Sequence, residues 1–412
     1  MSEILLGIIL FSAIVLALAV LVLAVRAVLA PAGKVTILIN KQRPVETTTG
    51  QKLLTALQDA GIAIPSTCAG VGSCGLCRVR VSDGGGDPLP TETARISRRD
   101  IRDGTRLACQ VTVRETMDVE VPESLISAGA FECTVVEGRF VSPLIRELVL
   151  DLPPDQPFKF TPGAYVQVTA PAYRLDFRDL QFPAAYIAAL DDLGVKGLTA
   201  QSKHEVMRAY SVANTPADAG RIVLLIRLAL PPPNHADAPP GVVSSYLFSV
   251  TPGDRLAVSG PFGDFGAVDS EREMIFIGGG VGMAPLRAII FDQLEQRKTE
   301  RTMSFWYGAR SRADLLFEQD FARLASGHSN FTWTPALSDP GPDDAWDGAT
   351  GFIHTVVFKQ LLKSHPAPEQ CEFYLCGPPL MMQAVLNMLE ECGADEDLIF
   401  FDDFGSSPYG TD

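Results

Sequence analysis

The chain has 412 residues and a formal net charge of −15. This acidic balance excludes a nucleic-acid-binding protein, which would need a basic face. A chain of this length predicts two or three domains. Its eight cysteines are too few for a scaffold built from disulfides, and their clustering indicates metal or redox chemistry in a reducing compartment.

The first segment of the chain is apolar. Residues 4–25 (ILLGIILFSAIVLALAVLVLAV) contain no charged side chain, and the run is long enough to cross a bilayer as a helix. A cleaved signal peptide ending near Ala30 is the alternative, but no positive side chain precedes the run, and the run is longer than a usual signal sequence. We therefore expect a transmembrane anchor over residues 1–30. Arg26 and Lys34 follow it, which places the later domains in the cytoplasm.

Residues 34–127 read as a small mixed sheet with one packed helix, the β-grasp pattern of an α+β domain. KVTILIN alternates apolar and polar side chains as a strand does, and RPVETTTGQKLLTALQDAGI reads as a second strand followed by a helix. The remaining expected strands are CRVRVSD, RLACQVTV and MDVEVP.

Four cysteines of this region predict a metal centre. Cys68, Cys74 and Cys77 have the spacing C-x5-C-x2-C, and Cys109 follows far downstream. Four thiolates can bind zinc or a [2Fe–2S] cluster. Zinc sites usually present two separated C-x2-C pairs, whereas here three ligands come from one loop. This asymmetry favours the cluster over zinc or disulfides.

Glycines in the cysteine loop fit the same prediction. Because Gly70, Gly72 and Gly75 lack Cβ atoms, the loop can fold closely around a cluster and point backbone N–H groups at its sulfurs. The other three cysteines that we considered are expected to be buried small hydrophobic side chains. They are Cys133, Cys371 and Cys392.

Residues 130–268 predict an antiparallel β-barrel or sandwich. The expected strands are FECTVVEGRF, IRELVLDL, AYVQVTA, MRAYSVAN and RIVLLIRLAL. A segment of about 173–206 interrupts them and is too long for a plain loop. Such an insertion is either a functional lid or partner surface, or an excursion without a role.

Two motifs of this second region suit a flavin dinucleotide. On a strand, Arg208 and Tyr210 face one side, where a guanidinium can pair with a pyrophosphate and a phenol can stack on a flavin. Ser211 could donate a hydrogen bond to flavin N5. Gly241-Val242-Val243-Ser244-Ser245 reads as a turn opening a helix, which is a phosphate site. Alone, R-x-Y-S is a weak signal, and a strand with one surface arginine is the plainer interpretation.

Residues 271–412 alternate strands and helices, which indicates a doubly wound parallel sheet of the α/β class. The run Gly278-Gly279-Gly280-Val281-Gly282-Met283-Ala284-Pro285 follows the strand EMIFI and precedes a helix. Its glycines allow a pyrophosphate to approach the backbone at a helix N-terminus. The run is not a full G-x-G-x-x-G, and no clear acidic residue stands where a ribose would need one.

A second motif, Cys376-Gly377-Pro378-Pro379, ends a later strand of this sheet. Ligands bind beyond the carboxyl ends of such strands, so the thiol could lie beside a nicotinamide. The alternative is a buried cysteine before a tight turn. Hydride transfer needs no general base, so the absence of a paired histidine and aspartate is no objection.

The order of these motifs (cysteine loop, R-x-Y-S, G-x-x-S, GGGVGMAP, CGPP) resembles the ferredoxin–NADP⁺ reductase superfamily with a plant-type ferredoxin domain fused in front. Over essentially all 412 residues the chain is similar to the family of F subunits of the Na⁺-translocating NADH:quinone oxidoreductase. SFWYGAR, ALSDP, WDGATGFIH, YLCGPP and DDFG carry this similarity. The cysteine loop has one residue more than the plant C-x4-C-x2-C pattern. That extra residue is typical of these F subunits and also occurs in adrenodoxin-type ferredoxins.

The resemblance implies an electron path. NADH would give hydride to FAD, and single electrons would pass through the [2Fe–2S] cluster to neighbouring membrane subunits of a bacterial inner-membrane complex that reduces quinone and pumps sodium. It also implies site residues. FAD would be held by Arg208, Tyr210, Ser211, Ser244 and Ser245, and NADH by Gly278–Pro285, by Gly308, Ala309 and Arg310, and by Cys376 to Pro379. Phe404 would cover the flavin ring, beside Ser211 and Cys376 in the catalytic centre.

Two other functions stay open on the sequence. A reductase component of a multicomponent oxygenase shares the three-domain order, but such proteins are usually soluble and lack the anchor and the insertion. A non-enzymatic zinc scaffold is the second. NADPH in place of NADH is also open, because Arg310 and Arg312 could meet a 2′-phosphate.

Overall fold

The computed structural model describes residues 7, 10–18, 33–62, 64–66, 70–72, 75–96, 98–122, 125–126, 129–154, 158–218, 220–231 and 238–402. They form two compact units, of which the first ends at Pro122. Residues 10–18 are helical. Among the residues that the structure describes, no helix is both long and apolar enough to cross a membrane. Most of the predicted anchor, 4–25, lies outside those residues, so the anchor stays a prediction.

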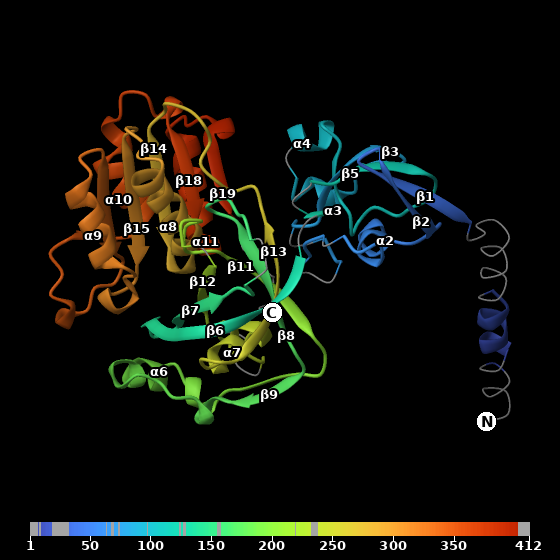
Figure 1. The fold of residues 1–412 in the computed structure, drawn as a ribbon, viewed down its shortest axis with the longest axis horizontal. Helices are drawn as coiled ribbons and strands as arrows, with labels where there is room; N and C mark the ends of the chain where they lie inside the picture. Colours follow the sequence, from blue (N-terminus) through green and yellow to red (C-terminus); the bar gives the residue numbers. More distant parts are fainter. Residues whose placement is uncertain are drawn as a thin grey trace. The chain divides into compact units, whose positions relative to one another are not determined.

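The first unit is the expected β-grasp domain. Its sheet has the order β2-β1-β5-β3-β4, with β1 and β5 parallel at the centre and the other pairs antiparallel (Figure 1). Its strands are β1 (Lys34–Ile39), β2 (Arg43–Thr48), β3 (Arg78–Asp83), β4 (Thr105–Leu107) and β5 (Met117–Glu120), and its helices are α2 (Leu53–Asp59), α3 (Pro90–Thr93) and α4 (Arg98–Arg102). Helix α2 buries Leu53, Leu54, Ala56 and Leu57 against the sheet.

One predicted strand of this unit is largely wrong. RLACQVTV was expected to be extended, but β4 ends at Leu107. The N–H groups of Gln110 and Val111 both donate to the Leu107 carbonyl, at 2.8 and 3.2 Å. The chain therefore turns at Cys109 instead of continuing along the sheet, and this turn is held by the two hydrogen bonds to the Leu107 carbonyl.

The second unit begins with an antiparallel barrel, as predicted. Its strand order is β11-β8-β13-β6-β7-β12, and an antiparallel bridge between Val212 and Leu224 joins the two end strands. The strands are β6 (Gly129–Ser142), β7 (Ile145–Asp151), β8 (Tyr165–Ala170), β11 (Val206–Ser211), β12 (Arg221–Arg227) and β13 (Arg255–Phe262), and one helix, α7 (Val242–Ser249), packs against the barrel core. Strand β13 was not among the expected strands. Its Gly260 and Pro261 lie where the pairing with β8 shifts register.

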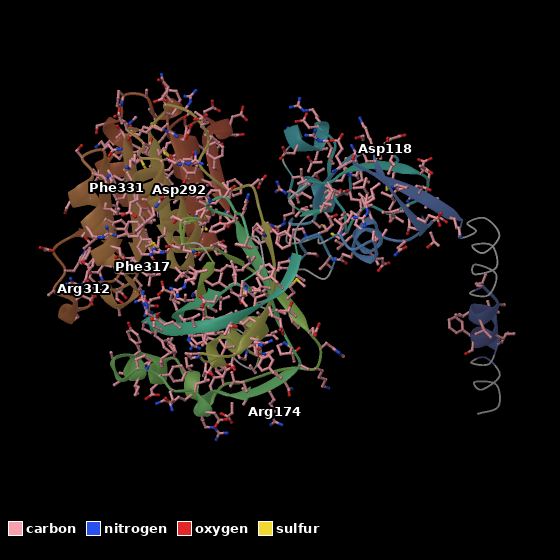
Figure 2. All side chains as sticks on the ribbon, in the orientation of Figure 1. Asp118, Arg174, Asp292, Arg312, Phe317 and Phe331 are labelled. Atoms are coloured by element: carbon pink, nitrogen blue, oxygen red, sulfur yellow. The ribbon has the colours of Figure 1, made fainter. Side chains whose placement is uncertain are left out.

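The insertion in the barrel is a folded element. It contains a hairpin of β9 (Tyr173–Asp176) and β10 (Thr199–Ser202), and helix α6 (Ile187–Asp192) lies between the two strands in the chain. Arg174, labelled in Figure 2, lies on β9. Phe177 and Leu190 are fully buried in the barrel core. The insertion therefore extends this core and is not a bare loop.

The rest of the second unit is a parallel sheet of order β17-β16-β15-β14-β18-β19 (Figure 1). Its strands are β14 (Met274–Gly279), β15 (Met303–Ala309), β16 (Phe331–Leu337), β17 (Ala349–Thr350), β18 (Glu372–Cys376) and β19 (Ile399–Asp402), and its helices are α8 (Met283–Phe291), α9 (Glu318–Gly327), α10 (Ile353–Gln360) and α11 (Pro379–Glu391). Two separate hydrophobic clusters show that helices cover both faces: α8 and α9 contribute to one, α10 and α11 to the other. This is the doubly wound sheet that the sequence predicts.

The barrel and the parallel sheet share a core. Ile145, Ala213 and Leu225 of the barrel belong to the same hydrophobic cluster as α8 and α9. Arg287 on α8 donates to the Ala213 carbonyl at 2.7 Å, and its guanidinium lies 5.0 Å from the ring centre of Phe317, which Figure 2 labels. Burial lowers the pKa of Arg287. Because these contacts fix the two domains against each other, their facing edges can form one site.

Candidate functional site

Two of the four predicted metal ligands lie within the described residues. Cys77 and Cys109 are both buried, and the backbone joins their segments, since the Ala108 N–H donates to the Cys77 carbonyl at 2.8 Å. Hydrogen bonding from Cys77, helped by the Gln110 amide, lowers the pKa of the Cys109 thiol to about 6 although burial opposes it. Two adjacent buried thiols, one of which has a lowered pKa, fit a metal or iron–sulfur centre. Cys68 and Cys74 lie outside the described residues.

Gln110 holds the cysteine loop against Cys109. Its side-chain amide donates to the Gly70 carbonyl at 3.0 Å and lies 3.4 Å from the Cys109 sulfur. Thr91 fixes the other end of this amide by donating to Gln110 Oε1 at 3.0 Å. Gln110 was not among the predicted site residues, because a glutamine beside a cysteine carries no signal of its own in the sequence.

The glycines of the loop are required by backbone conformation. Gly70, Gly72 and Gly75 have φ values of +87°, +83° and +69°, a region that L-residues with side chains rarely adopt. A Cβ on Gly72 would also lie 2.8 Å from the Gln110 side chain. The expectation that these glycines let the loop fold closely is consistent with both observations.

A buried ion pair supports the segment that leads into Cys109. Arg106 donates to both carboxylate oxygens of Glu92, at 2.9 and 2.8 Å, and the Leu107 N–H adds a third bond at 3.0 Å. The two side chains are 6 % and 0 % exposed. Burial opposes ionisation of Glu92, but the hydrogen bonds from Arg106, Leu89 and Leu107 outweigh it and lower its pKa.

In the second unit, three of the predicted motifs meet at the carboxyl ends of strands in the parallel sheet. Gly278 pairs with Cys376 on β18, Gly279 pairs with Gly308 on β15, and Cys376 pairs with Asp402 on β19. All lie at the carboxyl ends of their strands. Strands β15 and β18 flank β14 on either side and the chain reverses its winding there, which is the usual ligand position of a doubly wound sheet.

Close backbone packing explains the glycines at these strand ends. A Cβ on Gly282 would lie 2.0 Å from the Cys376 carbonyl oxygen, and one on Gly377 would lie 2.4 Å from the Met381 side chain. Tyr307, buried on β15, donates to the Gly280 carbonyl at 3.0 Å and fixes the turn. The glycine loop and the loop after Cys376 are therefore packed on one another and position each other.

Ser211 of the barrel lies beside these strand ends. Its hydroxyl donates to Asp402 Oδ2 at 3.0 Å, and Asp402 is the register partner of Cys376. Two of the three predicted catalytic residues, Ser211 and Cys376, are thus brought next to the same aspartate. Phe404 lies outside the described residues. Asp402 was missed as a site residue, although its place at the carboxyl end of the strand in LIFFDDF could have suggested it.

The remaining predicted flavin ligands lie on the barrel. Arg208 and Tyr210 lie two positions apart on β11, so their side chains point to the same face of the strand. They pair in register with Val168 and Val166 of β8. The Arg208 guanidinium donates to the Met207 carbonyl at 2.8 Å. Tyr210 packs against the barrel core. Both residues are half-buried, which leaves part of each accessible to a ligand.

The hydroxyls of Ser244 and Ser245 are turned inward at the start of α7. Ser244 donates to the Gly241 carbonyl at 3.2 Å and accepts from the Ala229 N–H at 3.3 Å. Ser245 is fully buried, and its hydroxyl has no hydrogen-bond partner among the described residues. Tyr173 donates instead to the Val242 carbonyl, and burial raises its pKa to about 12. At this helix start, the groups left to face a phosphate are backbone N–H groups.

Both arginines beyond Gly308 already have acidic neighbours. Arg310 Nε lies 3.6 Å from Asp314 Oδ2. Arg312, labelled in Figure 2, donates to the Asp344 carbonyl at 3.1 Å and lies 3.4 Å from Glu318 Oε1. Because both pairs are partly exposed, they disfavour a 2′-phosphate only weakly, by less than about 1 kcal/mol each.

Comparison with known families defines the class of protein. Residues 37–114 match the 2Fe-2S iron-sulfur cluster binding domain, residues 195–266 the oxidoreductase FAD-binding domain, and residues 276–387 the oxidoreductase NAD-binding domain. The chain is therefore an oxidoreductase with FAD-binding, NAD-binding and iron–sulfur domains. Each match falls on the region for which the sequence predicted that cofactor.

Full-length relatives define the family. The chain is 47 % identical over 403 residues to the F subunit of the Na(+)-translocating NADH-quinone reductase of Neisseria meningitidis serogroup B, covering 98 % of this chain and 100 % of the relative. It is 46 % identical over 405 residues to the protein of the same name from Klebsiella pneumoniae, with the same coverage. The chain belongs to the family of F subunits of Na(+)-translocating NADH-quinone reductases.

Solved structures show the same architecture in other reductases. An Amycolatopsis cytochrome P450 reductase aligns with a TM-score of 0.61 and 25 % identity, over 90 % of this chain and 98 % of that chain. A ferredoxin reductase in carbazole 1,9a-dioxygenase aligns with a TM-score of 0.58 and 26 % identity, with the same coverage.

Proposed function

We propose that this protein is the electron-input subunit of a Na⁺-pumping NADH:quinone reductase in a bacterial inner membrane. The observation that carries the proposal is the full-length similarity to F subunits, 47 % over 98 % of the chain. When bound, FAD would accept a hydride from NADH and release electrons one at a time to the [2Fe–2S] cluster. Sodium movement and quinone reduction would take place in partner subunits of the membrane complex.

The residues at the carboxyl ends of the parallel strands support the hydride-transfer part of the proposal. Gly278, Cys376 and Asp402 lie side by side in register, and Ser211 reaches them from the barrel. The nicotinamide would lie beside Cys376 and the flavin beside Ser211, so that the two rings meet where the two domains meet. Backbone N–H groups of the glycine turn and of the start of α7 would bind the two pyrophosphates, with Arg208 beside the flavin.

The iron–sulfur part rests on the first unit. Cys77 and Cys109 are adjacent and buried, and the pKa of the Cys109 thiol is lowered, which fits cluster ligation together with Cys68 and Cys74. The surrounding hydrogen bonds from Gln110 would fix the ligand geometry. The cluster would pass electrons on to a membrane partner.

We also propose that the apolar N-terminal segment anchors the protein in the membrane, with the domains in the cytoplasm. Residues 10–18 are helical and expose large apolar side chains: Leu10 is 62 %, Phe11 70 % and Leu16 68 % exposed. Contiguous apolar side chains in water are unfavourable, and a lipid environment would bury them. Removing residues 1–30 should release the protein from membrane vesicles; retention of the truncated chain in washed vesicles would contradict the anchor.

The decisive experiment is an anaerobic titration of the purified full-length protein with NADH, followed by visible and EPR spectra. Bleaching of the flavin and a rhombic [2Fe–2S] signal are expected. Cys68→Ala should abolish the EPR signal and leave flavin bleaching largely intact. A reconstituted protein without flavin or iron–sulfur absorption would instead support a zinc scaffold.

A reductase component of an oxygenase is the second candidate. The solved structures of a cytochrome P450 reductase and of the carbazole dioxygenase reductase favour it, but at 25 % and 26 % identity they are more distant than the F subunits at 47 %. Electron delivery to an isolated oxygenase, with none to an assembled quinone-reductase complex, would decide for this candidate.

A further inference from the structure

Three side chains with metal-binding atoms lie close together at the N-terminal ends of strands in the parallel sheet. Glu273 immediately precedes β14, Cys371 immediately precedes β18, and His365 lies in the loop before Cys371. Their ligand atoms all lie within 4.8 Å of one another. The nucleotide motifs lie at the C-terminal ends of the same strands. This cluster therefore lies at the other end of those strands and takes no part in the site described above.

We propose that Glu273, His365 and Cys371 bind one zinc ion. His365 Nε2 lies 3.1 Å from Glu273 Oε2 and 3.7 Å from Cys371 Sγ. In a tetrahedral zinc site, ligand bonds of about 2.0–2.3 Å place nitrogen and oxygen ligands about 3.4 Å apart, and nitrogen and sulfur ligands about 3.6 Å apart. These two separations agree with those values to within a few tenths of an ångström, and the third pair, Glu273 and Cys371, lies within 4.8 Å. Cys371 Sγ is also 3.9 Å from His365 Nδ1, so the imidazole must turn for Nε2 to share a zinc ion with the sulfur.

An open surface pocket adjoins the three ligands. It has a volume of about 500 Å³, and Glu271 and Gln370 lie in its wall beside the ligand residues. Because this pocket opens to solvent, water can supply the fourth ligand of a site with three protein ligands. Arg272, a cationic side chain in the same wall, has its guanidinium held by the Gln370 carbonyl at 3.1 Å.

The mixture of ligands selects the metal. A thiolate with an imidazole suits zinc, whereas calcium and magnesium prefer sites made of oxygen alone. Cys371 is 2 % exposed, and burial raises its pKa to about 12. Metal binding must therefore release the thiol proton. The imidazole must also move its proton from Nε2 to Nδ1, which gives up a long 3.3 Å hydrogen bond from the Ala367 N–H.

Zinc at this position would join two segments that are distant in sequence. Glu273 and Glu372 are already linked, because the Glu372 N–H donates to the Glu273 carbonyl at 2.9 Å. The ion would add a side-chain link from the segment before β14 to the loop before β18. Without zinc, the same geometry is a histidine–glutamate hydrogen bond beside a buried thiol, and the experiment separates these two states.

The test uses the full-length protein with its cofactors, incubated with zinc and dialysed against metal-free buffer. Elemental analysis should give one zinc per chain in addition to iron. Zinc X-ray absorption should show one sulfur neighbour together with nitrogen and oxygen neighbours. Cys371→Ser and His365→Gln should lower the zinc affinity by at least about 100-fold, since they remove ligands directly. Glu273→Gln provides a third variant of nearly unchanged size.

The matched control is Cys392→Ser, which removes a half-buried thiol elsewhere in the same domain and should retain zinc. The flavin content of each variant reports whether it has folded. Zinc with four sulfur neighbours and a matching loss of iron would place the ion at the cluster cysteines and overturn the proposal. Failure of the wild-type protein to retain zinc would overturn it too. A wild-type protein that does not retain zinc leaves the NADH titration unaffected. Zinc at the cluster cysteines would instead also remove the [2Fe–2S] signal of that titration, so the two proposals fail distinguishably.

Discussion

The Ser211 hydroxyl donates to Asp402 Oδ2 at 3.0 Å, across 191 positions of the chain. This bond joins the end of a barrel strand to the end of the last strand of the parallel sheet. Asp402 also pairs in register with Cys376. One aspartate therefore connects the predicted flavin side and the predicted nicotinamide side of the site.

Ser211→Ala should slow reduction of the flavin by NADH by about 10- to 100-fold, the range expected when a hydrogen bond involving a charged group is lost. Asp402→Asn keeps the shape and weakens the acceptor, so its effect should be smaller. Anaerobic stopped-flow absorbance measures both rates. Ser202→Ala, on the insertion hairpin, is the control and should be neutral. An unchanged rate in Ser211→Ala would remove Ser211 from the reaction.

Gly282→Ala should disturb the nucleotide site. The new Cβ would lie 2.0 Å from the Cys376 carbonyl oxygen, so the glycine turn must shift. We expect a stability loss of about 1–3 kcal/mol from overpacking and a higher KM for NADH with flavin retained. Thermal unfolding and steady-state kinetics measure these effects. Gly327→Ala meets no atom within 4 Å and should change neither quantity; an equal effect of both variants would contradict the packing argument.

Glu92→Gln should destabilise the iron–sulfur domain by about 3–5 kcal/mol, because Arg106 would keep a buried charge without a counter-charge. The folded protein lowers the pKa of Glu92 from its ordinary value of 4.5. The carboxylate therefore stabilises the fold above that value, and this contribution is lost as the pH falls through the lower folded pKa. Denaturant unfolding at several pH values, followed by cluster absorbance, measures this.

The exposed pair Arg80–Glu120 is the control for that prediction. Its side chains are 54 % and 42 % exposed and lie 3.7 Å apart, so Glu120→Gln should cost less than about 1 kcal/mol. Comparable losses in both variants would show that burial of the Glu92 pair is not what matters.

Gln110→Leu should lower the reduction potential of the iron–sulfur centre. The Gln110 amide lies 3.4 Å from the Cys109 sulfur, and a hydrogen bond to a ligand sulfur favours the reduced, more negative form. A redox titration monitored by EPR measures the potential. Thr91→Ala frees the amide without removing the donor and should give a smaller shift in the same direction. A potential that stays constant in Gln110→Leu would show that this bond is absent in the loaded protein.

The protein should prefer NADH to NADPH, since Arg310 and Arg312 each have an acidic neighbour. Asp314→Ala removes the partner of Arg310 and should raise kcat/KM for NADPH relative to NADH. Steady-state rates with both nucleotides give the ratio. A wild-type preference for NADPH would contradict the assignment, and an unchanged ratio in Asp314→Ala would exclude Arg310 from contact with the ribose.

Features that depend on residues close together in the chain could be predicted without coordinates. The spacing of Cys68, Cys74 and Cys77 is a property of one loop, and the glycine run after EMIFI lies between its own strand and helix. Alternating or continuous apolar patterns predicted β1, β6 and β14, because each strand must bury one or both faces. Local patterns failed at Cys109, where an alternating run predicted a strand and the chain turns instead, and they did not predict β13.

Which distant side chains meet could be learned only from the folded chain. Sheet register brings Asp402 beside Cys376, and the shared core of barrel and sheet brings Ser211 to the same carboxylate. Packing turns the Ser244 hydroxyl inward and leaves backbone groups at the start of α7. The strand order also gathers Glu273, His365 and Cys371 at one edge. Such contacts depend on how elements pair across long loops, and no local pattern in the sequence encodes that pairing.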